Sequence, residues 1–364
     1  MKQLLGCLWV LFFFASIGFA QERSGMKLDD VTAENLQDLV GGDNVEMVSA
    51  KEGSTYYVYA LWKDTRKGVG GSKVGWDTKY LYFNRSMDGG VTWGTEYALN
   101  TTLPLLEMED YQIVASETGQ YIHVLWTNSK GYEAGIYVVT SSDYGASFSA
   151  EKKIAGDGLT ENDTEGSAIC TSNDGRYVYV LWTVSPRYRA KNQQSYFSYN
   201  YNYGNPNEWS SPEKIAAGPN IRDGGGALGC SGDGNYCHFV FFDEREPGPE
   251  FGAYIRTWNR AARGWEQNEI KIEANIDRLY NVVCKRNDGK AHIIWSDGEG
   301  KLCHNAYSYV SRRGWTVGVQ NTIANGGVDC DEDEISFYYY GATDFCALMF
   351  PARIQSEPDR KSVV

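Results

Sequence analysis

Six pairs of bulky residues, each closing a hydrophobic run, recur along the chain and constrain its fold more than any other feature. Successive pairs lie roughly 53 to 64 residues apart, at Leu61-Trp62, Leu125-Trp126, Leu181-Trp182, Phe241-Phe242, Ile294-Trp295 and Met349-Phe350. A regular period of this kind is typical of a propeller, in which each repeated unit forms one blade. The sequence therefore predicts six repeated structural units.

Each unit has the pattern of four short antiparallel strands. A first strand and an Asp-Gly turn precede the bulky pair, which closes the second strand; a third strand, a turn and an outer strand follow it. First strands are expected at Ala168–Ser172, Ala227–Ser231 and Val282–Arg286, and outer strands at Glu151–Ala155, Glu213–Ala216 and Ile270–Glu273. The 40 glycines and the 14% aromatic content suit short strands joined by tight turns. We therefore expect an all-β, six-bladed β-propeller with four-stranded antiparallel blades.

A turn with the spacing Ser-x-Asp-x-Gly-x-x-aromatic occurs twice between third and outer strands. Its members are Ser86, Asp88, Gly90 and Trp93 in the first unit, and Ser141, Asp143, Gly145 and Phe148 in the second. The Asp carboxylate can bind backbone N–H groups while the Gly supplies the backbone geometry, so the aromatic ring can pack back onto the hairpin. This spacing resembles the Asp box, or BNR repeat, of the sialidase (neuraminidase) superfamily. The resemblance implies a sialidase-like propeller whose boxes lie on the face opposite the ligand site.

The first 20 residues have the features of a signal peptide. Lys2 supplies the basic region, Leu8–Phe14 is apolar, and Gly18-Phe19-Ala20 offers small residues at the cleavage positions. No later segment is long and apolar enough to span a bilayer. We expect a secreted, extracellular protein without membrane insertion.

Residues 21–364 are expected to form a single propeller domain, because no linker or low-complexity stretch divides them. The last unit lacks an outer strand, and Gly25–Asp30 has the pattern of one. An N-terminal strand near Met26–Asp29 would therefore close the ring by pairing into the last blade and leave no open sheet edge. A monomer is expected.

The ligand site is expected in the loops opposite the Asp boxes. Candidate ligand-binding residues there are Asp64, Arg66, Arg222, Asp223, Arg245, Arg278 and Glu332. Arginine forks suit carboxylated sugars, and carboxylate pairs suit glycoside hydrolysis; alternatively, these loops are polar because water surrounds them. The net charge of −13 argues against a nucleic-acid partner.

The sialidase resemblance implies an arginine triad, a Tyr–Glu pair and an Asp as catalytic groups. The first arginine belongs to an Arg-Ile-Pro motif entering the first blade, where this chain has Asn44-Val45-Glu46-Met47, and no Arg-Ile-Pro occurs anywhere. The position of the catalytic Tyr falls within Cys330–Glu334, which contains none. We therefore expect a protein that recognises glycans or glycoproteins, with divergent or absent sialidase catalysis. An active exo-glycosidase acting on terminal sugars of glycoconjugates and a non-enzymatic interaction scaffold remain as alternatives.

No cofactor is expected, and no Cys/His spacing indicates zinc, although Asp331–Glu334 could offer oxygen ligands to Ca²⁺. Removal of Cys7 with the signal peptide would leave seven cysteines. Counting outward from the Asp233-Gly234 turn places Cys230 opposite Cys237, so this pair is the disulfide candidate. Asn84, Asn100 and Asn162 begin Asn-x-Ser/Thr sequons, which are candidate glycosylation sites in a eukaryotic secretory pathway.

Overall fold

The structure is a computed structural model that describes residues 45–64, 80–100, 108–128, 134–156, 162–186, 194–215, 223–243, 252–266, 269–273, 276–284, 290–297, 302–310, 314–317, 321–324, 336–340 and 345–349. Regular structure in these ranges is entirely β-strand. Nothing in these ranges forms a helix of the length and hydropathy that a membrane span requires.

The described strands form six antiparallel sheets. The first three are β1 (Val45–Glu52), β2 (Thr55–Asp64), β3 (Tyr80–Ser86) and β4 (Tyr97–Ala98); β5 (Met108–Ala115), β6 (Ile122–Asn128), β7 (Gly135–Ser141) and β8 (Lys152–Ala155); and β9 (Asn162–Thr171), β10 (Val178–Pro186), β11 (Gln194–Asn200) and β12 (Glu213–Lys214). The fourth and fifth sheets are β13 (Asp223–Cys230), β14 (Tyr236–Asp243), β15 (Gly252–Asn259), β16 (Gly264–Trp265) and β17 (Ile270–Glu273); and β18 (Ile276–Cys284), β19 (Lys290–Asp297), β20 (Leu302–Val310), β21 (Gly314–Val317) and β22 (Asn321–Ala324). The sixth sheet contributes β23 (Ser336–Tyr340) and β24 (Phe345–Met349).

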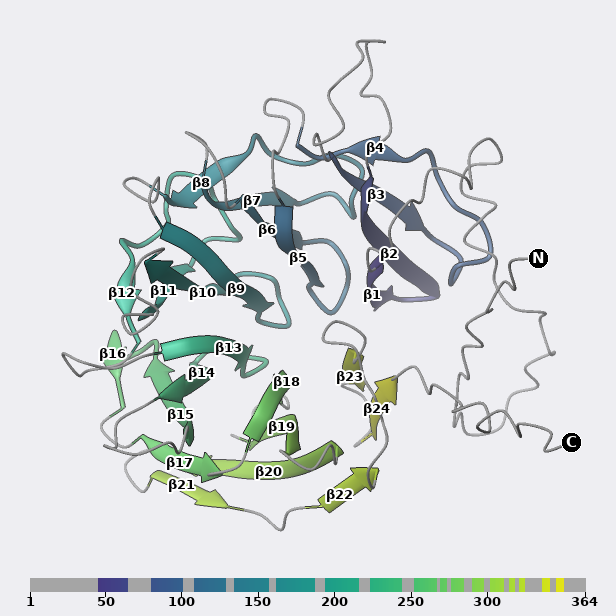
Figure 1. Cartoon of the computed structure of the whole chain (residues 1–364). Helices are drawn as coiled ribbons and strands as arrows, with labels where there is room; N and C mark the ends of the chain where they lie inside the picture. Colours follow the sequence, from purple (N-terminus) through teal and green to yellow (C-terminus); the bar gives the residue numbers. More distant parts are fainter. Residues whose placement is uncertain are drawn as a thin grey trace, which may run out of the picture.

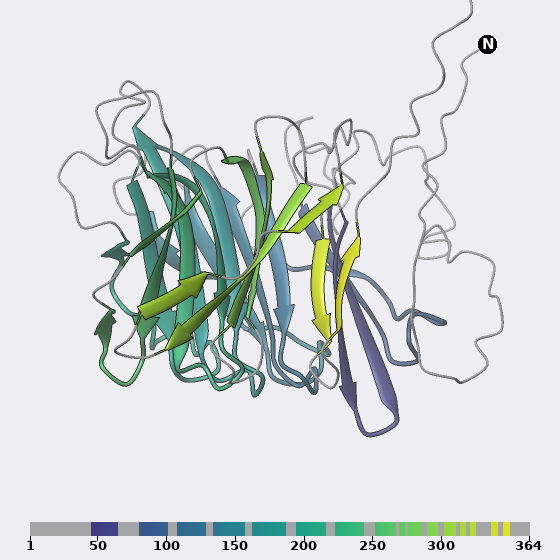
Figure 2. The same ribbon diagram turned by 90° about the horizontal axis from the view of Figure 1, so that it is seen from below.

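The sheets are arranged around a common centre, with the first strand of each sheet innermost (Figure 1). The inner strands β1, β5, β9, β13, β18 and β23 contact one another in this order. Seen from the side, the strands of the sheets run between two ends of the ring (Figure 2). The predicted closing strand near Met26–Asp29 lies outside the described residues.

The strands of the second, third and fourth sheets are hydrophobic because each of these sheets packs against a neighbour on both faces. Every residue of β6 is buried. Val124 and Trp126 pack in a core shared with the first sheet, whereas Leu125 packs in a core shared with the third. A strand enclosed in this way needs apolar residues on both faces, which explains the continuous apolar runs that end in the bulky pairs.

Backbone hydrogen bonds connect the turns that follow the inner strands. Lys51 N donates to Glu117 O at 3.0 Å, Glu117 N to Asn173 O at 2.7 Å, and Asn173 N to Gly232 O at 2.8 Å. This chain of bonds links the first four sheets one after another. Adjacent sheets are thus held together by polar contacts as well as by their apolar cores.

A side chain on the second strand of one sheet also bonds the turn glycine of the next. The pairs are Tyr59 Oη to Gly119 O at 3.1 Å, His123 Nε2 to Gly175 O at 3.1 Å, and Tyr179 Oη to Gly234 O at 2.7 Å. Gly175 has a φ of 76°, and a Cβ there would lie 2.5 Å from the Cβ of Tyr121. Glycine is required at this turn for its backbone conformation and for the close approach of the neighbouring sheet.

The turn containing Asp88 has the geometry that its spacing predicts. Asp88 Oδ1 accepts hydrogen bonds from Val91 N at 3.0 Å and Thr92 N at 2.8 Å, and Oδ2 accepts one from Thr92 Oγ1 at 2.6 Å. Ser86 Oγ accepts a bond from Gly90 N at 2.8 Å and donates one to Asp88 Oδ1 at 2.8 Å. The Trp93 side chain packs against the cluster of Ala60, Trp62 and Tyr82 in the first sheet.

The turn containing Asp143 repeats this network. Ser141 Oγ accepts a bond from Gly145 N at 2.9 Å, and Asp143 accepts bonds from Ser147 N at 2.9 Å and Ser147 Oγ at 2.5 Å. The Phe148 ring meets Phe83 of the first sheet edge-on, with 4.9 Å between ring centroids. The aromatic residue of this turn therefore packs between two sheets.

A third turn keeps part of the same geometry with Asn200 in place of serine. Asn200 Oδ1 accepts hydrogen bonds from Asn202 N at 2.8 Å and Gly204 N at 3.0 Å. Asn200 pairs with the first residue of β10, just as Ser141 pairs with the first residue of β6. An amide oxygen here replaces the serine hydroxyl as acceptor, so the turn keeps part of the geometry without the Ser-x-Asp spacing.

The predicted Cys230–Cys237 disulfide is not formed in the structure. The two residues are directly opposite each other in the β13–β14 register, as counting from the turn predicts. Both carry free thiols. Cys237 Sγ instead lies 3.9 Å from Cys170 Sγ of the third sheet.

Two of the three predicted glycosylation positions are buried. Asn84 Nδ2 donates to Gly94 O at 2.9 Å, and Asn100 Oδ1 accepts a 2.6 Å hydrogen bond from Leu81 N. The exposed fractions of Asn84 and Asn100 are 1% and 0%. A glycan on either Nδ2 is incompatible with this packing, so both predictions conflict with the folded structure. Asn162 is the first residue of β9, and its side chain lies outside the description.

Candidate ligand-binding face

The two ends of the ring differ in the segments that they carry. At one end, the turn between the third and outer strands bonds the turn that follows the inner strand: Gly89 N to Tyr56 O, Tyr144 N to Gln120 O, Tyr203 N to Arg176 O and Arg260 N to Asn235 O. This turn end therefore carries Asp88 and Asp143. The opposite end, here called the loop end, is where the inner strands begin and where the second strands lead into the third.

Four consecutive inner strands carry a bulge close to the loop end. The register shifts between Met108 and Tyr111 in β5, beside Trp182–Thr183 opposite β9, between Gly224 and Gly226 in β13, and between Ile276 and Arg278 in β18. A bulge bends its strand and changes the direction in which a side chain points, and bulges are common beside functional sites. These four inner strands thus share a local irregularity near the loop end.

Charged residues lie at or next to these bulges. The inner-strand positions are Glu109 and Asp110 in β5, Asp163 and Glu165 in β9, Asp223 in β13, and Asp277 and Arg278 in β18. Because consecutive inner strands contact one another, these positions lie at one end of neighbouring strands around the centre of the ring. This arrangement gathers acidic residues and one arginine on the predicted ligand face.

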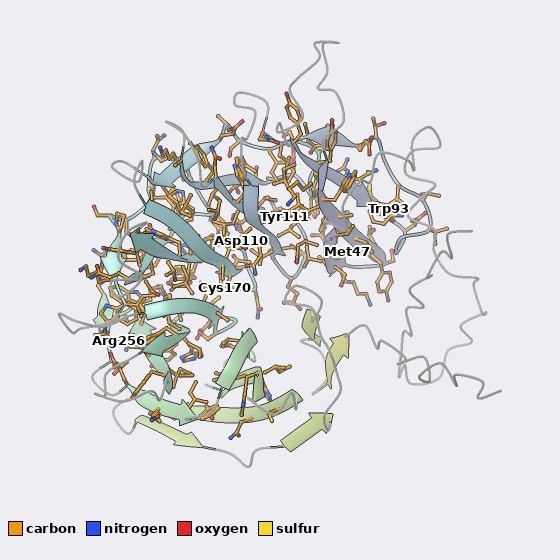
Figure 3. The ribbon with its side chains drawn as sticks, viewed as in Figure 1. Met47, Trp93, Asp110, Tyr111, Cys170 and Arg256 are labelled. Carbon is orange, nitrogen blue, oxygen red and sulfur yellow. The ribbon has the colours of Figure 1, made fainter. Side chains whose placement is uncertain are left out.

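Asp110 is an acid near this end whose side chain the structure describes. Its Oδ2 accepts a 3.0 Å hydrogen bond from Ser167 N of β9. Two positions further along β5, Gln112 Oε1 accepts a 3.0 Å bond from Ile169 N. Asp110 therefore joins the start of β5 to the middle of the adjacent inner strand β9. Figure 3 shows Asp110 beside Tyr111 toward the centre of the ring.

The sequence-predicted ligand residues are only partly within the described ranges. Asp64 ends β2 opposite Tyr80, so it lies at the loop end of a second strand. Asp223 begins β13, and Arg278 lies in the neighbouring inner strand β18 opposite Ser296. The structure thus brings the backbone positions of Asp223 and Arg278 to one end of adjacent inner strands. Arg66, Arg222, Arg245 and Glu332 lie outside the described residues, as does Asp331–Glu334.

Within the described ranges, no group of three or more His, Cys, Asp or Glu side chains is arranged to hold a metal ion. His123 and His238 are fully buried, and burial lowers the pKa of His123 to about 4 and that of His238 to about 3. Both histidines therefore serve as neutral hydrogen-bonding groups between strands.

No protein-family model matches the chain, and no curated protein matches it. Several solved structures are similar to the chain. A point mutant of the α-L-arabinofuranosidase Arb93A of Fusarium graminearum, in complex with an iminosugar inhibitor, is 14% identical, with a TM-score of 0.52 over 83% of this chain and 85% of that one. A protein of unknown function from Dyadobacter fermentans is 12% identical, with a TM-score of 0.50 over 85% of this chain and 95% of that one. A Hadza microbial sialidase is 14% identical, with a TM-score of 0.47 over 78% of this chain and 59% of that one.

These similarities, together with the ring of antiparallel sheets, define the class of the protein. The chain has an all-β, propeller-like fold built from antiparallel sheets. At identities of 14% or below, the similarity concerns the fold and leaves the activity to be argued from the site.

Proposed function

We propose that this protein is a secreted, glycan-recognising propeller that binds its ligand at the loop end. The observation that carries the proposal is the set of acidic positions beside the bulges of β5, β9, β13 and β18. Sugars present many hydroxyl groups, and carboxylates are strong acceptors for them. Neighbouring inner strands that each carry an acid near one end would offer several acceptors to one ligand.

The structural neighbours support a sugar as the ligand. The arabinofuranosidase that resembles this chain over most of its length binds an iminosugar inhibitor. Ligands of folds built around a common centre are held by loops at one end of a rigid scaffold. The bulges are at the loop end here, which favours that end over the end that carries Asp88 and Asp143.

The proposal includes the architecture of the ring. Six blades are proposed, with the strand near Met26–Asp29 completing the sixth, whose described part is the β23–β24 hairpin. Deleting residues 21–30 from the mature protein would expose an unpaired edge. The melting temperature should fall markedly, and an unchanged melt would contradict this closure.

The entry to the first blade argues against sialidase catalysis. Glu46 is the second residue of inner strand β1 and pairs with Leu61. A sialoside carboxylate needs convergent guanidinium groups, and Glu46 places a carboxylate where the resemblance implies an arginine. The proposal is therefore recognition without sialidase turnover.

A glycan-array screen followed by calorimetry of the best ligand tests the proposal. Asp223→Asn and Arg278→Gln should each weaken binding at least tenfold. The matched control is Asp174→Asn, which changes a carboxylate in a turn at the other end of the ring and keeps the Oδ1 that accepts bonds from Ser172 and Arg176. Unchanged affinity in both loop-end variants, or no binding to any glycan, would contradict the proposal.

The acidic positions also support a second candidate, an exo-glycosidase. Paired carboxylates act as acid and as base or nucleophile in glycoside hydrolysis. Asp110 and Asp223 are the first positions to test, with a panel of p-nitrophenyl glycosides that includes the α-L-arabinofuranoside and with a fluorogenic sialoside. Turnover that Asp223→Asn abolishes would favour the glycosidase, whereas binding without turnover would favour recognition.

A further inference from the structure

Three cysteines from two adjacent sheets meet in one core. Cys170 lies in β9 of the third sheet, Cys230 ends β13, and Cys237 lies in β14 of the fourth sheet. Cys230 and Cys237 are buried members of the core between these sheets, and Cys170 packs against it from β9. Figure 3 shows Cys170 on the side of β9 that faces β13. We call Cys170, Cys230 and Cys237 the thiol trio.

Cys170 contacts both other members of the trio. Its Sγ lies 3.9 Å from Cys237 Sγ, and its side chain also hydrogen-bonds that of Cys230. A disulfide has an S–S length of about 2.05 Å, so a movement of about 2 Å would bring Cys170 and Cys237 to bonding distance. Cys170 and Cys237 are therefore close enough to be joined by a small rearrangement of two side chains.

The three thiols differ in how far they are exposed to solvent. The described residues offer no metal-binding group of three or more Cys, His, Asp or Glu side chains. Cys237 is fully buried and Cys230 is 8% exposed, whereas Cys170 is partly exposed. Among these three thiols Cys170 is the most exposed, so an external oxidant reaches it first, and the Cys237 sulfur lies 3.9 Å from the Cys170 sulfur.

We propose that Cys170 and Cys237 form a disulfide between the third and fourth sheets when the chain folds with a small-molecule disulfide such as oxidised glutathione. The thiolate of Cys170 attacks the glutathione disulfide, forms a mixed disulfide and releases one glutathione thiolate. The thiolate of Cys237 then attacks the Cys170 sulfur and releases the second glutathione. Two protein thiols are oxidised to one disulfide, one glutathione disulfide is reduced to two glutathiones, and Cys230 keeps its thiol.

Burial affects when this bond forms. Burial raises the pKa of the Cys237 thiol to about 12, so little thiolate is present once the core has closed. The exchange is therefore expected during folding, before the two sheets pack fully. The link would close a loop between residues 67 positions apart and would oppose separation of the two sheets.

Mass spectrometry of the full-length mature protein, refolded in a glutathione redox buffer, tests the pairing. After alkylation under denaturing conditions and digestion without reductant, the peptides containing Cys170 and Cys237 should be joined, with Cys230 alkylated. The joined pair should weigh 2 Da less than the sum of the two peptides. A Cys230–Cys237 link, a Cys170–Cys230 link, or alkylation of all three cysteines would each overturn the proposal.

Thermal unfolding gives a second readout. The oxidised protein should melt about 5–10 °C above the reduced protein. Cys170→Ala and Cys237→Ala should each abolish this difference, and Cys230→Ala should retain it. Cys303→Ala, which removes a buried thiol from the fifth sheet, is the matched control and should also retain it. Loss of the difference in Cys230→Ala alone would overturn the assignment.

Discussion

Tyr179 donates a hydrogen bond from its hydroxyl group to the carbonyl oxygen of Gly234 in the neighbouring sheet, at 2.7 Å. Tyr179 is fully buried, and burial raises the pKa of its hydroxyl group, so the group remains a donor over the physiological range. His123 and Tyr59 make the same kind of contact one and two sheets earlier. By this bond each of the first three sheets contacts the turn of the next sheet.

Tyr179→Phe should lower the free energy of unfolding by about 1 kcal/mol, the usual loss for one buried hydrogen bond. The cost is limited because Arg260 Nε also donates to Gly234 O, at 3.2 Å, and continues to do so in the variant. Urea unfolding measures the change.

The matched control for this prediction is Tyr196→Phe. Tyr196 Oη donates to Gln194 Oε1 within its own sheet and is only partly buried. Removal of the Tyr196 hydroxyl group should change the free energy of unfolding by less than about 0.5 kcal/mol. An equal loss in the two variants would mean that the bond between sheets has no special value.

Ser86→Ala should lower the free energy of unfolding by about 1–2 kcal/mol. Ser86 is 1% exposed, and the variant leaves Gly90 N without its acceptor in the Asp88 turn. Ligand affinity should not change, because this turn and the proposed ligand site are at opposite ends of the ring. The exposed Ser142→Ala is the control for stability. Reduced affinity in Ser86→Ala with unaltered stability would place the ligand site at the turn end.

Much of the fold is predictable from the sequence because it depends on local patterns. Hydrophobic runs with bulky ends identify second strands, and the outer strands expected at Glu151–Ala155 and Ile270–Glu273 correspond to β8 and β17. The inner strands begin earlier than predicted: β9 starts at Asn162, although the sequence favoured Ala168. The polar residues at these starts are typical of loops, and only pairing with the second strand makes them β-structure.

The candidate site was less predictable because it depends on strand irregularities and on contacts between sheets, which local patterns do not show. A bulge adds one residue to a strand, and this leaves little trace in the hydrophobic pattern. Gly166 and Gly225, the extra residues opposite Trp182–Thr183 and beside Gly224, are the signal that sequence analysis could have used, since glycine within a strand often marks a bulge. Cys170 and Cys237 are 67 residues apart in sequence. Their contact depends on how two neighbouring sheets pack, so the sequence pattern does not show it.

The hydrogen-bonded Asp88 carboxylate should account for part of the stability that the protein loses in acid. Hydrogen bonds from the Thr92 hydroxyl, the backbone and Ser86 lower the pKa of Asp88 to about 2. The unfolded chain has a pKa of about 3.9 at this position, so the folded state binds the proton less readily. The stabilising effect is present above pH 4 or so and is lost as the pH falls toward 2. Urea midpoints at pH 5 and pH 2.5 should differ less in Asp88→Asn than in the wild type, and an identical difference would contradict the assignment.

Protonation of His123 should lower the stability of the protein in a pH range above that of Asp88. Its ring is fully buried, with Nε2 3.1 Å from Gly175 O and Nδ1 3.0 Å from Thr140 Oγ1. The carbonyl oxygen can only accept, so Nε2 carries the hydrogen, and Nδ1 of the neutral ring accepts the hydroxyl hydrogen of Thr140. Protonation would bury a positive charge and remove that acceptor.

Burial lowers the pKa of His123 to about 4, whereas the unfolded chain has a value of about 6.5. Between these values the unfolded chain binds a proton that the folded protein excludes. Stability is therefore complete above pH 6.5 or so and falls as the pH drops toward 4, by roughly 2–3 kcal/mol between pH 7.5 and 4.5. His238, whose pKa burial lowers to about 3, adds a loss in the same direction.

His123→Gln keeps a side-chain donor for Gly175 O and cannot titrate, so it separates the two histidines. The difference in unfolding free energy between pH 7.5 and pH 4.5, measured with urea, should shrink by about half, and His238→Gln should give a similar reduction. The double variant should have little pH dependence left in this range, because the Asp88 carboxyl titrates below it. A full wild-type dependence in the double variant would show that other groups control the acid response between pH 7.5 and 4.5.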